Sequence, residues 1–176
     1  LSFALNHWFS GGFDSRAMKA TNLAIHLGNV LLVFALVRAV ARQVHADEER
    51  ARTIGLLAAA FWALHPINLM AVLYVVQRME SLCHTFVFAG LWMYIAGRRR
   101  QLEGRWGWSH ILGGLAGGTL LGLTSKESAV LLPLYALVLE LVLYRFKDFG
   151  GRGDRRLQLA FLVLLVLPAI VGGGWL

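Results

Sequence analysis

The chain has 176 residues, of which 57% are hydrophobic and 15% are charged, and its mean hydropathy is +0.60. Soluble domains usually carry about 25% charged residues, so this composition excludes an ordinary soluble domain. The apolar runs lack the period of two that an outer-membrane barrel requires. The sequence therefore predicts an all-α, polytopic integral membrane helical bundle. The single cysteine, Cys83, excludes an internal disulfide and a cysteine-based metal site.

The net charge of +7 is unevenly distributed along the chain. Thirteen of the 17 lysines and arginines fall in three short segments, 38–52, 98–106 and 145–156, which alternate with apolar runs. This is the positive-inside pattern, and it predicts that the three segments are cytoplasmic loops. Their expected partners are anionic membrane lipids rather than nucleic acid.

The first expected span covers residues 18–37 and follows an interfacial segment, 1–16. It carries a polar stripe at helical spacing: Lys19, Asn22, His26 and Asn29. The spacing places these side chains on one face of the helix. Two interpretations stay open, namely hydrogen bonding between helices and the lining of a cavity.

The stretch 61–81 combines an apolar background with His65-Pro66 and then Gln77, Arg78 and Glu80. Proline disfavours helix at the preceding residue and removes a backbone donor, so a helix should break here. Ionisable groups within membrane segments are expensive and are therefore candidates for a functional site. The flanking apolar segments, 54–64 and 81–97, are both shorter than the roughly 20 residues of a full span. We expect a broken hairpin whose apex lines a water-filled cavity.

A second hairpin is expected over residues 109–144. Its first half contains Gly114, Gly118 and Gly122, a tandem small-xxx-small face that lets another helix approach closely. The chain then breaks at 124–127, where Thr124 and Glu127 have the spacing of a capping box. A last apolar run begins at 157. The whole of 1–176 thus reads as a single transmembrane domain of about six spans, with two short or broken hairpins.

If the basic segments share the cytoplasmic side, both hairpin apices lie on the opposite side. Arg78 and Lys126 would then be close to one cavity, where they could bind a phosphate. Glu80 and Glu127 are weak candidates for a catalytic base. The expected cavity lining consists of His65, Gln77, Asn22, His26 and Asn29.

A purely structural alternative also stays open at these apices. Arg78 with Glu80, and Lys126 with Glu127, would neutralise each other and only hold the hairpins. Glu140 is expected to form an interfacial pair near the cytoplasmic surface, five residues before Arg145. No metal motif, glycine-rich phosphate loop or nucleophile elbow is visible. No cofactor is identified, and a requirement for a divalent metal stays open.

Several segments, in this order, resemble the membrane half of bacterial tetratricopeptide-repeat membrane proteins: LSFALNHW, NLAIHLGN, FWALHP, YVVQRMESL and SKESAVLLP. The chain is also similar, more distantly, to the transmembrane and tetratricopeptide-repeat O-mannosyltransferases of eukaryotes. Both groups look like members of the GT-C glycosyltransferase superfamily.

The resemblance implies an enzyme of the bacterial inner membrane that takes a sugar from a polyprenyl-phosphate-linked donor. The acceptor would be a protein or a glycan on the non-cytoplasmic face. The resemblance also implies an acidic catalytic loop before Leu1 and repeats after the membrane part, so we expect 1–176 to be a piece of a longer chain and inactive alone. The residues that carry over are Arg78, Glu80, Lys126-Glu127, His65-Pro66, Asn22, His26 and Asn29. Competing functions are a transporter or flippase for an anionic lipid or solute, and a non-catalytic membrane scaffold.

Overall fold

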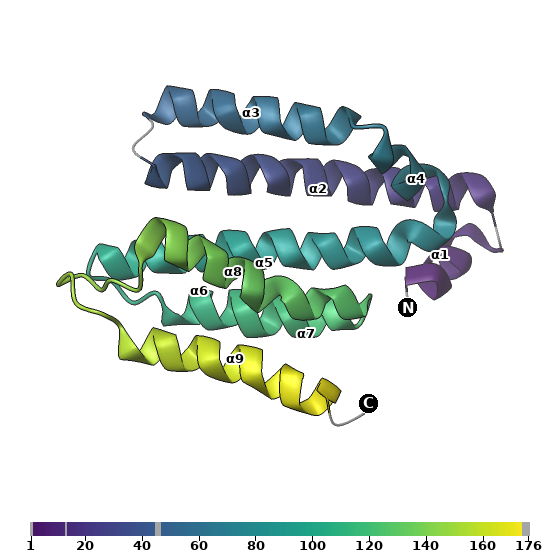
Figure 1. Cartoon of the computed structure of the whole chain (residues 1–176). Helices are drawn as coiled ribbons and strands as arrows, with labels where there is room; N and C mark the ends of the chain where they lie inside the picture. Colours follow the sequence, from purple (N-terminus) through teal and green to yellow (C-terminus); the bar gives the residue numbers. More distant parts are fainter. Residues whose placement is uncertain (1, 13, 45–46, 174–176) are drawn as a thin grey trace.

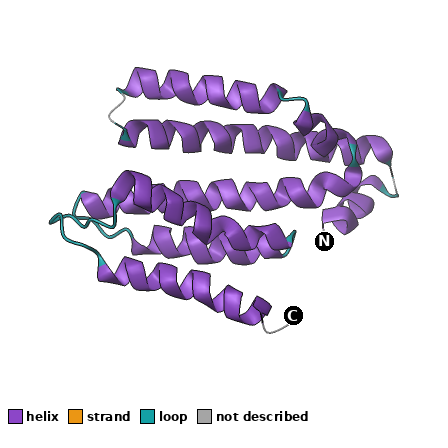
Figure 2. Ribbon diagram, viewed as in Figure 1, coloured by secondary structure: helices purple, strands orange, loops and turns teal. Residues whose placement is uncertain are grey.

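The computed structural model describes residues 2–12, 14–44 and 47–173, and nearly all of them are helical (Figures 1 and 2). In chain order the elements, with η marking 3₁₀ or π-helical segments, are α1 (Ser2–Ser10), α2 (Ser15–Gln43), α3 (Glu48–Leu64), α4 (Ile67–Leu73), η1 (Val75–Gln77), α5 (Arg78–Leu102), α6 (Trp108–Leu112), η2 (Gly113–Gly117), α7 (Gly118–Leu123), η3 (Glu127–Leu131), α8 (Leu132–Leu139), η4 (Glu140–Tyr144) and α9 (Arg155–Gly173). The long helices lie side by side and reverse direction at each turn (Figure 1). The prediction of an all-α bundle is confirmed for the described residues.

Within the described residues, two helices are long and apolar enough to cross a membrane. They are α2 and the continuous run from Glu127 to Tyr144, and the bent pair α3–α4 makes a third if it is counted as one span. These helices are compatible with membrane association. Two or three membrane-capable helices fall short of the roughly six spans expected from the sequence.

The distribution of side chains supports a membrane environment. Polar and charged side chains are buried inside the bundle, among them Asn22, Asn29 and Arg78. Large apolar side chains point outward instead, such as Phe61, 78% exposed, and Leu64, 83% exposed. A water-soluble monomer rarely exposes large contiguous apolar patches, whereas lipid tails are suitable neighbours for them.

Two of the three basic segments are largely helix ends rather than loops, which corrects the predicted boundaries. Helix α2 continues to Gln43, and α3 begins at Glu48, where the Asp47 carboxylate accepts a hydrogen bond from the Arg50 amide at 2.7 Å. Helix α5 likewise continues to Leu102. Arginine is a good helix former and is favoured in the last turn, so the charges do not end these helices. All three turns nevertheless lie at one end of the bundle (Figure 1).

The break at His65-Pro66 is confirmed. Helix α3 ends at Leu64, and α4 continues at an angle of 64° to it. The 3₁₀ turn η1 then leads into α5 at the end of the bundle opposite the basic turns (Figure 1).

The glycine face also packs as predicted, and its partners are α5 and the start of the next helix. A methyl group at Gly114 would lie 2.5 Å from the carbonyl oxygen of Gly90 on α5, and one at Gly122 would lie 2.5 Å from Cβ of Ala129. Gly117, one residue off this face, has no such neighbour within 4 Å. The absence of side chains at Gly114 and Gly122 therefore sets how closely these helices approach.

Candidate functional site

A cavity of about 790 Å³ lies between α2, the bent pair α3–α4, and α5, with Tyr135 of α8 on one wall. It reaches along α5 from Glu80 to Leu91, a stretch of roughly 17 Å at 1.5 Å per helical residue, and Gln77 of η1 also lines it. Its polar lining comes from His26, Asn29, Asn68, Gln77, Glu80, Ser81 and His84. Farther along α5 the lining is apolar, at Val87, Phe88 and Leu91. The α5 wall of the cavity is thus polar near the hairpin apex and apolar farther along the helix, while α4 adds Ile67 and Met70 near the apex.

The polar stripe of α2 forms hydrogen bonds between helices. Asn29 donates from Nδ2 to the carbonyl oxygen of Ser81 at 2.9 Å and accepts from the Thr85 hydroxyl at 2.7 Å. The ring of His26 stacks on Trp62, with 5.1 Å between centroids, and its Nε2 lies 3.3 Å from the carbonyl oxygen of Ala63. Both residues also line the cavity. The two interpretations of the stripe are therefore compatible for Asn29 and His26.

Asn22 differs from these two because it lies outside the cavity lining. Its Nδ2 donates to the carbonyl oxygens of Val72 and Tyr74, each at 3.3 Å, and its Oδ1 accepts from Nε of Arg78 at 2.8 Å. Asn22 thus donates to two backbone carbonyls where α4 gives way to η1, one of which, that of Tyr74, also accepts from the Gln77 amide at 3.1 Å. This is the arrangement that broken backbone at membrane depth requires.

Arg78 is fully buried and does not line the cavity. Its guanidinium donates to Asn22, to the carbonyl oxygen of Met18 at 2.9 Å and to that of Ser2 at 3.4 Å, and it lies 4.7 Å from the centre of the Phe3 ring. It forms no ion pair with any described carboxylate, so the expected pairing with Glu80 is not observed. In this conformation Arg78 holds α1 and α2 against the start of α5, and its guanidinium is not available to a phosphate in the cavity.

Lys126 and Glu80 form an ion pair that joins the two hairpin apices. Glu80 lines the cavity with 28% of its side chain exposed, and Lys126 is 40% exposed. The hydrogen bond to Glu80, together with the charge of that carboxylate, raises the pKa of Lys126 above its usual value. Glu127 is exposed and makes no ion pair among the described residues, so the alternative pairing within 126–127 is not formed. Lys126 is not among the residues that line the cavity, and its ammonium group is linked to the lining through Glu80.

The predicted capping box at this turn is wrong. The Thr124 hydroxyl donates to the carbonyl oxygen of Leu121 at 2.6 Å instead of capping the next helix. Lys126 occupies the cap position with an extended backbone, and no side chain caps η3. The Thr124 hydroxyl thus adds a second hydrogen bond to a carbonyl oxygen that the Thr124 amide already reaches at 3.2 Å.

His65 and Gln77 have different positions. Gln77 lines the cavity, as expected. His65 is exposed and lies outside the lining, where its Nδ1 accepts from the Ile67 amide at 3.3 Å and so supports the start of α4. Sequence reasoning missed His84, whose Nδ1 lies 3.9 Å from the Glu80 carboxylate and 2.8 Å from its backbone carbonyl oxygen. The spacing of four residues after Glu80 was the signal that could have found it.

The predicted ion pair of Glu140 is also corrected, because its partner is Arg98 rather than Arg145. The pair is fully buried and bidentate, with both nitrogen–oxygen distances at 2.9 Å. Glu140 further accepts from the Tyr94 hydroxyl and from the Phe146 amide. The chain leaves η4 with Arg145 in a left-handed conformation, at φ 52°, which brings that amide back to the carboxylate. This cluster fixes the last turns of α5 to the start of η4 and to the turn after it, and it has a structural role.

The described residues contain no cluster of three or more histidine, cysteine, aspartate or glutamate side chains that could hold a metal ion. Comparison with protein-family models, with curated proteins and with solved structures gives no match to this chain.

Proposed function

We propose that this chain forms the lipid-embedded domain of a glycosyltransferase that uses a polyprenyl-phosphate-linked sugar. The transfer would take place at the non-cytoplasmic face of a bacterial inner membrane, to an acceptor protein or glycan. The observation that supports the proposal most is the cavity of about 790 Å³ with the Glu80–Lys126 pair at its polar end. Its apolar continuation suits a polyprenyl chain, and its polar end suits a sugar and a phosphate.

The chemistry of such a transfer assigns a role to Lys126. The acceptor oxygen bonds to the anomeric carbon while its hydroxyl proton passes to a base, and the bond from that carbon to the phosphate oxygen breaks. The departing polyprenyl phosphate takes the electron pair of that bond, so negative charge develops on it. A cation placed there stabilises the transition state. Lys126 can supply this charge, and Glu80 positions its ammonium group.

We assign Arg78 a structural role in place of the phosphate-binding role expected from the sequence. A fully buried guanidinium that is committed to Asn22 and to two backbone carbonyls stabilises the apex rather than the phosphate. Glu80 remains a weak candidate for the base, since its carboxylate already pairs with Lys126. Glu127 is exposed away from the cavity lining and is a weaker candidate.

We also propose a six-pass topology for the domain. In support of it, the bundle brings the three basic turns to one end and both hairpin apices to the other (Figure 1). The positive-inside rule then assigns the basic end to the cytoplasm. The cavity with Lys126 would open toward the opposite side.

A non-catalytic scaffold is the second candidate, and the interhelical hydrogen bonds of Asn22, Asn29 and Arg78 favour it. The two candidates differ in what they require of Lys126. A scaffold needs no phosphate ligand there, whereas the proposed transferase does.

Binding of polyprenyl phosphate to the protein in lipid nanodiscs tests the difference, measured by native mass spectrometry. We expect Lys126→Ala to weaken binding roughly tenfold or more, because a charge-assisted contact to phosphate is lost. Lys19→Ala, an exposed lysine near the same end of the bundle, is the matched control and should bind as the wild type does. Polyprenol without phosphate should not distinguish the variants. Equal binding of polyprenyl phosphate by Lys126→Ala and wild type would contradict the proposal.

A further inference from the structure

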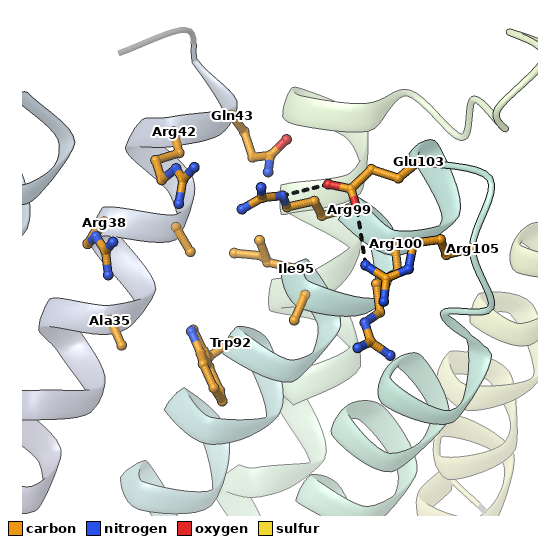
Figure 3. Close-up of a pocket in the computed structure, with 12 residues that line it drawn as sticks. Ala35, Arg38, Arg42, Gln43, Trp92, Ile95, Arg99, Arg100, Glu103 and Arg105 are labelled. Atoms are coloured by element: carbon orange, nitrogen blue, oxygen red, sulfur yellow. Dashed lines mark hydrogen bonds and ion pairs between the residues drawn. The ribbon is translucent and has the colours of Figure 1, made fainter. Parts of the chain in front are cut away.

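A second cavity, of about 380 Å³, lies between the C-terminal ends of α2 and α5. It is at the basic end of the bundle, away from the turns that hold Lys126 (Figures 1 and 3). Arginines converge on it from α2, from α5 and from the turn after α5, as Figure 3 shows: Arg38, Arg42, Arg99, Arg100 and Arg105.

Each of the two walls carries both apolar residues and arginines, and on α2 the first arginine, Arg38, comes three residues after Ala35. Helices α2 and α5 run in the same direction and pack side by side (Figure 1). Ala35 precedes Arg42 by seven residues, and Trp92 precedes Arg99 by seven residues, which is about two helical turns or roughly 10 Å. Ile95 and Ala96 continue the apolar wall between these levels. The cavity is therefore amphipathic, with an arginine rim and an apolar floor.

The carboxylates around this cavity do not balance its arginines. Glu48 pairs with both Arg38 and Arg42, the latter at 3.1 Å. Glu103 pairs with Arg99 at 2.9 Å and with Arg105 at 3.7 Å.

Arg100 forms no ion pair with any described carboxylate. Among the described residues, five guanidinium groups thus face two carboxylates, which leaves three positive charges without a counter-charge. An anion is the ligand that such a cavity favours.

We propose that this cavity binds the phosphate of an anionic membrane lipid, with an acyl chain lying against Trp92. Guanidinium groups bind phosphate oxygens in a bidentate fork, and basic pockets between helices on the cytoplasmic side suit anionic headgroups. A free phosphate would satisfy the arginines but would leave the apolar floor without a partner. Trp92 is 44% exposed, so its ring is available to a lipid chain. The proposal depends on membrane insertion and not on sugar transfer.

The test compares phosphatidylglycerol with phosphatidylcholine, added to the purified full chain in detergent and followed by native mass spectrometry. The double variant Arg42→Gln/Arg100→Gln removes two charges from the cavity. Arg152→Gln/Arg155→Gln removes two exposed charges from the same end of the bundle and is the matched control. We expect the cavity variant to lose roughly tenfold or more in affinity for phosphatidylglycerol, and the control to change less than about twofold. Arg100→Gln alone, which breaks no ion pair, should show part of the same loss and guards against a folding defect.

A second measurement separates a lipid from free phosphate. Phosphatidylglycerol with brominated chains should quench tryptophan fluorescence in the wild type and less so in Trp92→Phe, and millimolar inorganic phosphate should not displace it. Equal loss of affinity in the cavity and control variants would overturn the proposal, because binding would then depend on the net positive charge at this end of the bundle and not on the cavity. Equal quenching in Trp92→Phe, or full displacement by inorganic phosphate, would overturn the lipid assignment.

Discussion

The ammonium group of Lys126 and the carboxylate of Glu80 meet across 46 residues of sequence and join the apices of two helical hairpins. Both side chains are partly exposed, so solvent screens the pair and its contribution to stability is small. Its importance lies in its place, since Glu80 lines the larger cavity and fixes where the cation stands.

The first prediction concerns the protonation of Lys126. Glu80→Gln should lower the pKa of Lys126 toward its usual 10.5, because the raised pKa results mainly from the hydrogen bond and charge of Glu80. With a pKa raised by folding, the pair contributes stability that is fully present below 10.5 and is lost as the pH rises through the higher folded value. NMR titration of ¹³C-methylated lysines, with the Lys126 signal assigned by Lys126→Arg, measures the pKa of Lys126. Glu127→Gln is the control and should have a smaller effect; no change with Glu80→Gln would show that the pair does not form.

The second prediction concerns the buried pair of Arg98 and Glu140. Arg98→Met should destabilise the bundle by about 3–5 kcal/mol, because Glu140 would remain buried without its cation. Arg98→Met/Glu140→Leu should recover much of this loss. Arg99→Ala, which removes an exposed ion pair one residue away, should change stability by less than about 1 kcal/mol. Thermal unfolding in detergent measures all three, and similar losses for Arg98→Met and Arg99→Ala would be inconsistent with the buried pair.

The third prediction concerns the close packing of α5 against the glycine face. Gly114→Ala should destabilise the protein by about 1–3 kcal/mol, since the new methyl group would meet the backbone of Gly90. Gly117→Ala faces open space and should instead be neutral or stabilise the helix by up to about 1 kcal/mol. The same unfolding assay compares them. Equal effects would mean that the two helices do not approach closely at Gly114.

The fourth prediction concerns the proposed topology. On a Cys83→Ser background, Thr124→Cys should react with a membrane-impermeant thiol reagent from the non-cytoplasmic side. Arg100→Cys and Arg152→Cys should react only from the cytoplasmic side, since the three basic turns share one end of the bundle. Labelling of all three positions from the same side would refute the six-pass arrangement.

Local and periodic signals in the sequence predicted much of the fold. The break at His65-Pro66 follows from the missing donor of proline, and the packing of Gly114 and Gly122 follows from spacing alone. The ends of the helices were harder to predict, because Arg42 and Arg99 are compatible with both a helix terminus and a loop. Their charge indicates a side of the membrane and does not mark where the helix stops.

The pairing of charges could not be predicted from local sequence. Glu127 is adjacent to Lys126, yet the carboxylate that meets the ammonium group is Glu80 on another helix. Arg98 likewise pairs with Glu140 and not with a nearby residue. Such choices depend on how the helices stack, and the stacking is set by packing over the whole bundle. The role of Arg78 could not be predicted from local sequence either. Its charge at a helix break suggested a phosphate ligand, whereas in the structure its guanidinium donates to oxygen atoms of the protein.

The central claim is that the larger cavity receives a polyprenyl phosphate beside Lys126, and photocrosslinking tests it most directly. A polyprenyl-phosphate analogue with a photoreactive group next to the phosphate would be incorporated with the protein into nanodiscs, irradiated, and the adducts mapped by peptide mass spectrometry. The account predicts adducts on cavity-lining residues of α4 and α5, such as Asn68 and His84, and their loss in Lys126→Ala. Adducts confined to the basic end around Arg99 and Arg100, and unchanged in Lys126→Ala, would contradict it.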